Sequence, residues 1–296
     1  MSSPKTGREV LAILVNYNTG PMLREAVDSL LRGSFRPDVV VVDNASTDRS
    51  IDALKDDRKY RDGVELIVNE DNLGFAKANN QILRTRKAKY YLLMNPDCAL
   101  NVDTVEEFVR HMDANPDIGL AGGTLKNPDG SIQKTSKRKF PTPLTGLARS
   151  LGVHRFNVSQ PRLPDFDLAR EAPGDNAIEE VEAISGALMF VRGSLLSRVG
   201  LLDEGFFMHC EDLDWCKRFW DAGSKVAYIP SAIALHHKGG SGRSPAVVWH
   251  LHRGMIRFYR KHYHRQYPLP VSLLVYAGIE LRCLLLLAYS VVSRNR

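Results

Sequence analysis

The first part of the chain alternates short apolar runs with amphipathic stretches. The apolar runs, each suited to a buried strand, are residues 10–15, 39–42, 64–68 and 90–94. Residues 22–31, 75–83 and 103–112 instead repeat apolar side chains at helical spacing. This alternation of strand and helix predicts an α/β fold with a Rossmann-like wound, mainly parallel sheet.

The pattern changes in the middle of the chain. Residues 130–177 are rich in Lys, Arg, Pro and Asp with little periodicity, and we predict a long, mobile, basic loop there. Such a loop is either a solvated surface segment or a contact for an acceptor or a membrane, and the pattern favours neither. Periodicity returns at residues 183–191, in a helical face after residue 212 and in a strand at 226–235.

The C-terminal residues 246–296 differ from the globular domain that we assign to residues 1–245. Basic and aromatic side chains first predict an amphipathic helix, and residues 271–292 then form an apolar stretch long enough to span a bilayer. Because Glu280 and Arg282 lie near its centre, a simple span would be costly. We therefore predict an interfacial or partly inserted helix, with a helix packed on the domain as the alternative.

Composition and charge narrow the classes of partner. The 44% hydrophobic and 25% charged residues are ordinary globular values, and the net charge of +6 favours anionic partners such as nucleotides or an acidic membrane surface. The chain has no zinc-knuckle spacing and no aromatic-basic RNA-binding signature, so we expect no nucleic acid partner. Four cysteines without a Cys-x-x-Cys pair, and a polar N-terminus without an apolar signal segment, predict a reducing cytosolic setting.

Acidic side chains recur where predicted strands end and helices begin. Pro96 has no N–H and must end the fourth strand, which leaves Asp97 at the carboxyl end of a central strand, where open α/β sheets bind ligands. Glu211 and Asp212 begin a helix, whose N-terminus favours an ionised carboxylate such as a general base, although such acids also simply complement a helix dipole. Asp97 with a distant imidazole, from His236 or His237, would form a sparse oxygen–nitrogen site suited to Mg²⁺ or Mn²⁺.

Seven segments, in this order, resemble the inverting glycosyltransferases of family 2, which have the GT-A nucleotide-diphospho-sugar transferase fold. The segments are residues 14–18, 41–48, 69–76, 95–97, 185–187, 211–215 and 236–241. Within the family, the chain is most similar to bacterial rhamnosyltransferases that act on polyprenyl-diphosphate-linked sugars. The resemblance implies a GT-A catalytic domain at residues 1–245, followed by membrane-associating helices.

The resemblance also implies roles for individual residues. Asp212 would be the catalytic base and Glu211 its neighbour, and Trp215 and Gly186 would contact the acceptor. Residues 95–97 stand in place of the family's Asp-x-Asp motif, with Asn95 replacing the first acid. Asp97 and His236 would then hold Mg²⁺ or Mn²⁺, with His237 in reserve. The implied donor-binding residues are Asn16, Tyr17, Asp43, which would contact the base or ribose, Asn72, Gly74 and Phe75, which would frame the nucleotide, and Asn95 and Asp97.

The implied reaction is the transfer of a sugar, L-rhamnose from dTDP-rhamnose by similarity to the rhamnosyltransferase branch, onto a polyprenyl-diphosphate-linked saccharide. It would take place at the cytoplasmic face of the membrane, in cell-wall or surface-polysaccharide synthesis. One alternative is another hexosyl or galactofuranosyl transferase with a UDP-sugar donor. A second alternative is a non-catalytic nucleotide- or glycan-binding membrane module, for which Asn95 leaves room and against which the Glu211-Asp212 pair argues. A nucleotidyltransferase is disfavoured because no Gly-rich triphosphate loop is present.

Overall fold

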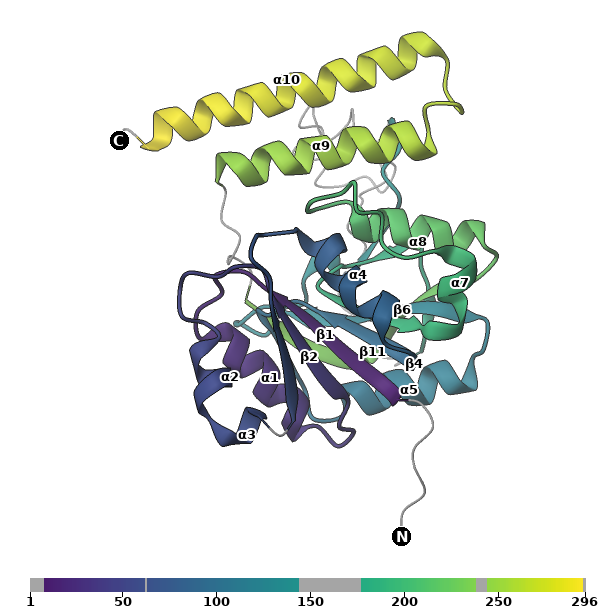
Figure 1. Ribbon diagram of the computed structural model, residues 1–296. Helices are drawn as coiled ribbons and strands as arrows, with labels where there is room; N and C mark the ends of the chain where they lie inside the picture. Colours follow the sequence, from purple (N-terminus) through teal and green to yellow (C-terminus); the bar gives the residue numbers. More distant parts are fainter. Residues whose placement is uncertain (1–7, 62, 144–176, 238–243, 295–296) are drawn as a thin grey trace.

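A twisted, mainly parallel sheet forms the centre of the protein (Figure 1). The structure, a computed structural model, describes residues 8–61, 63–143, 177–237 and 244–294. The strand order is β3-β2-β1-β4-β10-β6-β11-β5, with β8 paired to β11. The six strands that share one direction are β1 (Arg8–Asn16), β2 (Asp38–Asp43), β3 (Val64–Val68), β4 (Ala88–Met94), β6 (Ile118–Lys126) and β11 (Lys225–His236). The predicted α/β fold is therefore confirmed.

Three short strands run against this direction. β10 (Leu188–Arg192) lies between β4 and β6, while β5 (Cys98–Leu100) and β8 (Glu179–Glu180) pair with β11. A separate small sheet joins β7 (Lys137–Arg138) to β9 (Ala183–Ile184). β10 and β5 matter most for function, because they bring distant segments to the carboxyl ends of the parallel strands.

Helices cover both faces of the sheet, so its strands are apolar on both sides. Successive residues of β1 alternate between the two cores, with Leu11 and Ile13 in one and Ala12 and Leu14 in the other. The first core also holds α4 (Phe75–Thr85), α7 (Leu196–Val199), which follows the turn η3 (Gly193–Leu195), and α8 (Glu211–Asp221). The second core holds α1 (Met22–Arg32), α2 (Asp52–Asp56), α3 (Arg58–Arg61) and α5 (Thr104–Ala114).

The part of the predicted mobile loop that the structure describes is folded. After β6, Ile132 forms a bridge with Lys126, and the turn η1 (Lys134–Ser136) leads into β7. The Ser136 hydroxyl accepts a 3.0 Å hydrogen bond from Leu125 N–H. Residues 132–138 of the predicted loop thus hold an isolated bridge, a turn and a short strand. Residues 144–176 lie outside the described residues, and the mobility of the loop stays a prediction.

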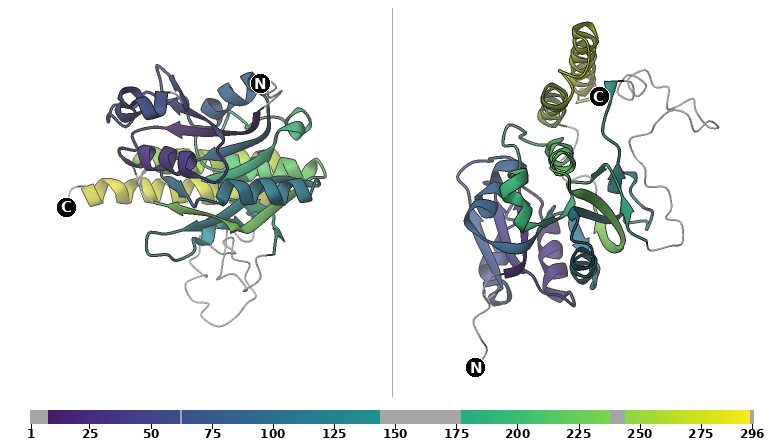
Figure 2. Two further views of the ribbon diagram at one scale, coloured as in Figure 1. Left: turned by 90° about the horizontal axis from the view of Figure 1, so that it is seen from below. Right: turned by 90° about the vertical axis from the view of Figure 1, so that its right-hand side faces the viewer.

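Two antiparallel helices form an outer layer on one side of the domain (Figures 1 and 2). α9 (Pro245–His262) begins with Ser244 as N-cap and lies between the domain and α10 (Leu269–Arg294). Both charges of the apolar segment turn toward α9: Glu280 accepts a 2.6 Å hydrogen bond from Arg253, and Arg282 lies 2.9 Å from His252 Nε2. Residues Leu269–Ser290 are long and apolar enough to cross a membrane by length and composition.

Candidate active site

The ends of four strands bring polar side chains to one edge of the sheet. Asn16, the last residue of β1, stands opposite Asp43, the last residue of β2. β4 runs beside β1, so the Asn95–Asp97 turn follows at the same edge. β5 returns along β11 and sets Cys98 opposite His236. Residues from very different parts of the sequence thus meet where parallel α/β sheets bind ligands.

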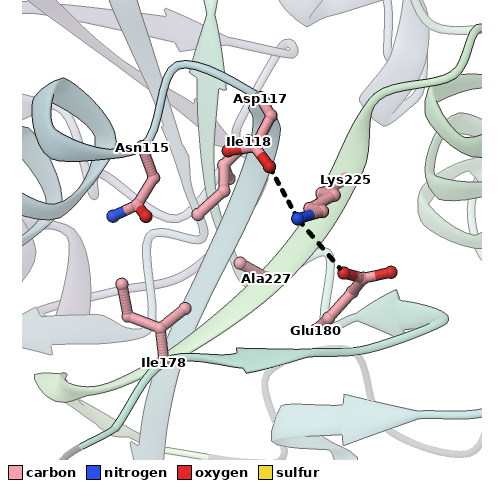
Figure 3. A pocket seen from close by; sticks show the side chains of 7 residues that line it. All are labelled: Asn115, Asp117, Ile118, Ile178, Glu180, Lys225 and Ala227. Atoms are coloured by element: carbon pink, nitrogen blue, oxygen red, sulfur yellow. Dashed lines mark ion pairs between the residues drawn. The ribbon is translucent and has the colours of Figure 1, made fainter.

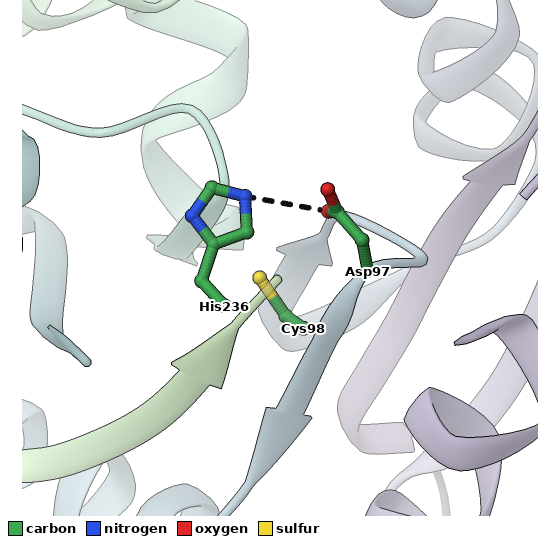
Figure 4. A group of neighbouring side chains, drawn as sticks. All are labelled: Asp97, Cys98 and His236. Atoms are coloured by element: carbon green, nitrogen blue, oxygen red, sulfur yellow. Dashed lines mark ion pairs between the residues drawn. The ribbon is translucent and has the colours of Figure 1, made fainter. Parts of the chain in front are cut away.

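Asp97 and His236 face each other at this edge (Figure 4). His236 Nε2 lies 3.3 Å from Asp97 Oδ1. Gln133 fixes the ring, because its amide nitrogen donates to the His236 carbonyl at 2.9 Å and its amide oxygen lies 2.9 Å from His236 Nδ1. Nδ1 must therefore donate to Gln133, which in the neutral ring leaves the Nε2 lone pair aimed at a carboxylate oxygen.

This arrangement suits a divalent cation. Asp97 Oδ1 is buried and accepts no hydrogen bond from the described residues. Cys98 is close to both groups, but its thiol donates to the Ala187 carbonyl at 3.5 Å, and a sulfur ligand is not what Mg²⁺ or Mn²⁺ prefers. Of the two candidate histidines, His236 is the one that faces Asp97, since His237 Nε2 lies 3.5 Å from Glu25 on α1. Asp97 and His236 would supply two ligands and leave other positions to phosphate and water.

The loop after β1 is held by a buried polar network. The Asn16 amide donates to Asp43 Oδ1 at 2.7 Å and to the Ser50 hydroxyl at 2.7 Å, while Asp43 Oδ2 accepts from Ser46 N–H at 3.0 Å. Asp43 is only 1% exposed and supports the loop from below. Its contact with a nucleotide base or ribose stays a prediction. Tyr17, which follows Asn16, is 50% exposed and available to a ligand.

The turn before α4 has a shape that requires glycine. Gly74 has φ +79°, and a Cβ there would lie 2.4 Å from the Phe207 carbonyl oxygen. Asn72 Oδ1 accepts the Gly74 N–H at 3.0 Å, and Phe75 N–H donates to the same Phe207 carbonyl at 3.0 Å. This turn is therefore fixed to the segment that leads into α8, although the Phe75 ring itself packs against the core.

The first turn of α8 buries two neighbouring carboxyl groups. Asp212 Oδ2 accepts from Gly186 N–H at 2.9 Å and from the Arg138 guanidinium, and its Oδ1 accepts from Leu213 N–H at 2.8 Å. Glu211 Oε2 is buried and has no partner among the described residues. A Cβ on Gly186 would lie 3.1 Å from Asp212 Oδ2, so a small residue is needed there.

A short segment links these acids to the cation pair. Gly186 bonds Asp212, and the carbonyl of the next residue, Ala187, accepts the Asn95 N–H at 3.0 Å. Asn95 is two residues from Asp97, so the position of the acids is mechanically tied to the Asn95–Asp97 turn. The candidate base and the turn that carries the candidate cation ligand Asp97 are therefore linked through Gly186 and Ala187.

The structure corrects the prediction for Trp215. Its side chain is 0% exposed, donates to the Gly200 carbonyl at 3.0 Å and packs on Phe219, so it cannot serve as a platform for an acceptor. The helix is buried on most of its surface, which leaves this aromatic ring no route to solvent.

Sequence reasoning missed four residues at or beside the site. Arg138 and Gln133 were assigned to the predicted loop, and only the pairing of β7 with β9 and the hydrogen bonds of Gln133 with His236 show where they lie. His209 and Cys210, directly before α8, have φ of +67° and +68°, a conformation that non-glycine residues rarely adopt and that often marks functional sites. No residue type in the sequence signals that backbone conformation.

A cavity of about 200 Å³ lies elsewhere, at the opposite ends of β6 and β11 (Figure 3). Lys225 spans it with ion pairs to Asp117 at 2.6 Å and Glu180 at 3.7 Å. Its charges pair with one another, and it lies at the amino ends of the strands, so we do not assign the chemistry to it.

Comparison with known proteins identifies related sequences. A family model described as Glycosyl transferase family 2 matches residues 12–174. A Mycobacterium tuberculosis H37Rv protein named N-acetylglucosaminyl-diphospho-decaprenol L-rhamnosyltransferase is 30% identical over 248 residues, which cover 79% of this chain and 78% of that protein. Escherichia coli K12 rhamnosyltransferase WbbL is 25% identical, with 82% of this chain and 89% of that protein covered.

Solved structures share the fold. A crystal structure of GalNAc-T7 with UDP, GalNAc and Mn²⁺ superposes with a TM-score of 0.63 at 14% identity, covering 93% of this chain and 55% of that one. Staphylococcus aureus TarS residues 1–349 in complex with UDP give a TM-score of 0.57 at 16% identity, with 92% and 70% covered. At these identities the likeness concerns the arrangement of helices and strands.

Proposed function

The chain belongs to glycosyltransferase family 2 and has the GT-A fold, and on this premise we propose that it transfers L-rhamnose from dTDP-rhamnose to a polyprenyl-diphosphate-linked saccharide, with inversion. The observation that carries the proposal is the link, through Gly186 and Ala187, between Asp212 and the turn that carries the Asp97 carboxylate facing His236. The name of the Mycobacterium tuberculosis relative supports rhamnose as the sugar and a lipid-linked acceptor, and that of the Escherichia coli relative supports rhamnose.

The proposed chemistry needs a base and a stabilised leaving group. Asp97 and His236 would hold Mg²⁺ or Mn²⁺, which when bound neutralises charge on the donor diphosphate. Asp212 takes the proton of the acceptor hydroxyl as its oxygen bonds to sugar C1, while the C1–O bond to the diphosphate breaks and leaves its electron pair on the diphosphate. Attack from the opposite face inverts the anomeric centre in one step, so no covalent nucleophile is required.

The donor would lie over the carboxyl edge of β1, β2 and β4. Tyr17 and the Asn72–Gly74 turn would frame the nucleotide from above the network that Asn16 and Asp43 hold together. The Asn95 main chain, whose N–H donates to the Ala187 carbonyl, would lie beneath the diphosphate of the donor.

Helix α10 supports a function at a membrane surface. Its exposed side chains are almost all apolar, and its two central charges are paired with α9. The apolar residues with the greatest exposure on α10 are Leu269, Leu273, Leu274, Leu281, Leu284, Leu285 and Tyr289. We propose that this face lies in the cytoplasmic interface of an anionic membrane, where a polyprenyl-linked acceptor is found.

A transfer assay tests the proposal. The purified protein is given dTDP-rhamnose, UDP-galactose or UDP-glucose, a lipid-linked N-acetylglucosaminyl diphosphate, and Mg²⁺, Mn²⁺ or a chelator. We expect rhamnosyl transfer with inversion that the chelator abolishes, and a loss of about 10²–10⁴-fold in turnover for Asp212→Asn with donor binding retained. Transfer from a UDP-sugar alone would overturn the donor assignment, and full activity of Asp212→Asn would overturn the base.

A further inference from the structure

Arg138 is a basic residue of the acid cluster that the proposed reaction has not yet used. The pairing of β7 with β9 sets it opposite Ala183, and its Nη2 donates to the Ile184 carbonyl at 2.6 Å as well as to Asp212 Oδ2. Only 19% of its side chain is exposed, and its Nε is buried with no partner among the described residues. The Arg138 guanidinium on β7 thus binds one acid of the pair, Asp212 on α8.

The two carboxyl groups of this pair have very different surroundings. Asp212 accepts hydrogen bonds from Arg138, Gly186 and Leu213, whereas Glu211 Oε2 accepts none from the described residues. Burial raises the pKa of Glu211 to about 8, and the neighbouring charge of Asp212 adds to that effect. Burial acts on Asp212 as well, but the charge and hydrogen bond of Arg138 keep its pKa below the ordinary value.

We propose that Arg138 is a positioning residue of the transfer reaction: it holds Asp212 ionised and occupies its Oδ2, so that Asp212 Oδ1, and not Glu211, receives the acceptor proton. Oδ2 already has two donors, Arg138 and Gly186 N–H, while Oδ1 has one, Leu213 N–H, and keeps a lone pair free. Two acids with opposite protonation states are a common arrangement where one of them must act as a base. This inference rests on the proposed function.

The other charged and titratable groups near Asp212 are the same in the wild type and in an Arg138 variant. A difference in the Asp212 titration between the two proteins therefore reports on Arg138. Besides Glu211, these groups are His209 and Cys210 in the turn before α8, and Asp214 and Cys216 on α8. None of these supplies a second cation that is directly hydrogen-bonded to Asp212.

The test measures the protonation of Asp212 directly. Protein labelled with carbon-13 at the Asp and Glu carboxyl carbons is titrated by NMR, with Asp212→Asn and Glu211→Gln used for assignment. Removal of a neighbouring opposite charge raises a carboxyl pKa by about 1–3 units, so we expect a rise of that size for Asp212 in Arg138→Gln. A change below about half a unit would overturn the proposal, because the ion pair would then not govern the charge of Asp212.

Two further variants keep the result interpretable. Arg138→Lys retains the charge, so a smaller rise is expected than in Arg138→Gln. Arg138→Met, which also removes the charge, decides the question if Arg138→Gln does not fold. Arg218→Gln is the matched control, because Arg218 forms a similar pair one turn along α8, 2.9 Å from Asp214. It should lower the melting temperature and leave the titration of Asp212 unchanged; an equal shift in this control would overturn a specific role for Arg138.

The kinetic arm separates this inference from the proposed function. In Arg138→Gln the acid limb of kcat/KM should move up in pH by the same amount as the Asp212 titration, and Arg138→Lys should restore most of it. If the wild type transfers the sugar but the acid limb of Arg138→Gln stays at the wild-type pH, the positioning role alone is overturned. Absence of transfer by the wild type from every donor would overturn the proposed function, while the NMR titration still reports whether Arg138 sets the charge of Asp212.

Discussion

The two C-terminal helices lie side by side, yet they relate to the catalytic domain in opposite ways. α9 and its C-cap Tyr263 bury Phe258, Tyr259 and Tyr263 in the same core as α8. α10 contacts α9 and leaves most of its leucines exposed, with Leu274 at 74%. α10, the more apolar helix, is therefore less buried than α9. Hydrophobicity alone does not tell which helix completes the fold and which presents an apolar face to another surface.

α9 also fixes the segment that carries the acids. Arg257 and Lys261 donate to Asp203 at 2.7 and 2.8 Å, and His262 lies 2.8 Å from Asp214 on α8. The proposed boundary after residue 245 thus separates elements that share a core. On this basis we expect α9 to support the turn before α8, which holds His209 and Cys210, and α10 to supply a contact with a membrane; the following experiments test that division.

The largest expected effect is on membrane binding by α10. Replacing Leu274, Leu281 and Leu285 together by Gln should weaken binding to anionic vesicles by about 100-fold or more, since each leucine that enters the interface contributes roughly 1 kcal/mol. Co-sedimentation measures the loss. Val102→Gln, at an exposed apolar residue outside α9 and α10, is the control and should bind vesicles as the wild type does. Unchanged binding of the triple variant would contradict the role of this face.

A smaller effect is expected when the contact of α9 with the turn before α8, which holds His209 and Cys210, is disturbed. A Cβ on Gly254 would lie 2.7 Å from the His209 carbonyl oxygen, so Gly254→Ala should destabilise the protein by about 1–3 kcal/mol and reduce turnover. Gly278 on α10 is the matched glycine, with no atom within 4 Å of its Cβ position. Gly278→Ala should stabilise its helix by up to about 1 kcal/mol. Equal effects of the two in urea unfolding would remove the distinction between the helices.

The smallest effect is a dependence on pH. Hydrogen bonds from Arg257 and Lys261 lower the pKa of Asp203 despite its burial, so its contribution is complete above the unfolded pKa near ~3.9 and disappears as pH falls through the folded value. Asp203→Asn should cost about 1.5 kcal/mol at pH 7 and progressively less below about pH 4. Urea unfolding at pH 7 and pH 3 measures this. Glu280→Gln on α10, whose partner is half-exposed, should cost less than about 0.5 kcal/mol; a larger loss there would reverse the comparison.

The sequence predicted the parallel part of the sheet because its strands are uninterrupted apolar runs, and β1 to β4 confirm it. It did not predict β6, whose run is broken by Gly122 and Gly123. A Cβ on Gly123 would lie 2.1 Å from the Ala232 carbonyl oxygen, so close backbone approach, which no periodicity reveals, requires these glycines. The meeting of Asp97 with His236 followed from strand ends, a local signal.

Other parts of the site depend on contacts that sequence spacing does not encode. Arg138 reaches Asp212 through a two-residue strand, too short to produce an apolar pattern. The role predicted for Trp215 came from the family resemblance, whereas its burial depends on contacts of α8 with other elements, which sequence spacing does not show. The inward direction of Glu280 and Arg282 was equally hidden, since it depends on Arg253 and His252 of another helix.

Strand β10 makes the active site a late product of protein synthesis. It lies antiparallel between β4 and β6, so these two strands obtain their shared neighbour only after residues 188–192 have left the ribosome. Asp97 meets His236 later still. Until then β4 and β6 present unpaired N–H and C=O groups, which invite pairing with other chains. We therefore expect a nascent chain that is stalled after β6 and before residue 188 to be prone to pairing with other chains.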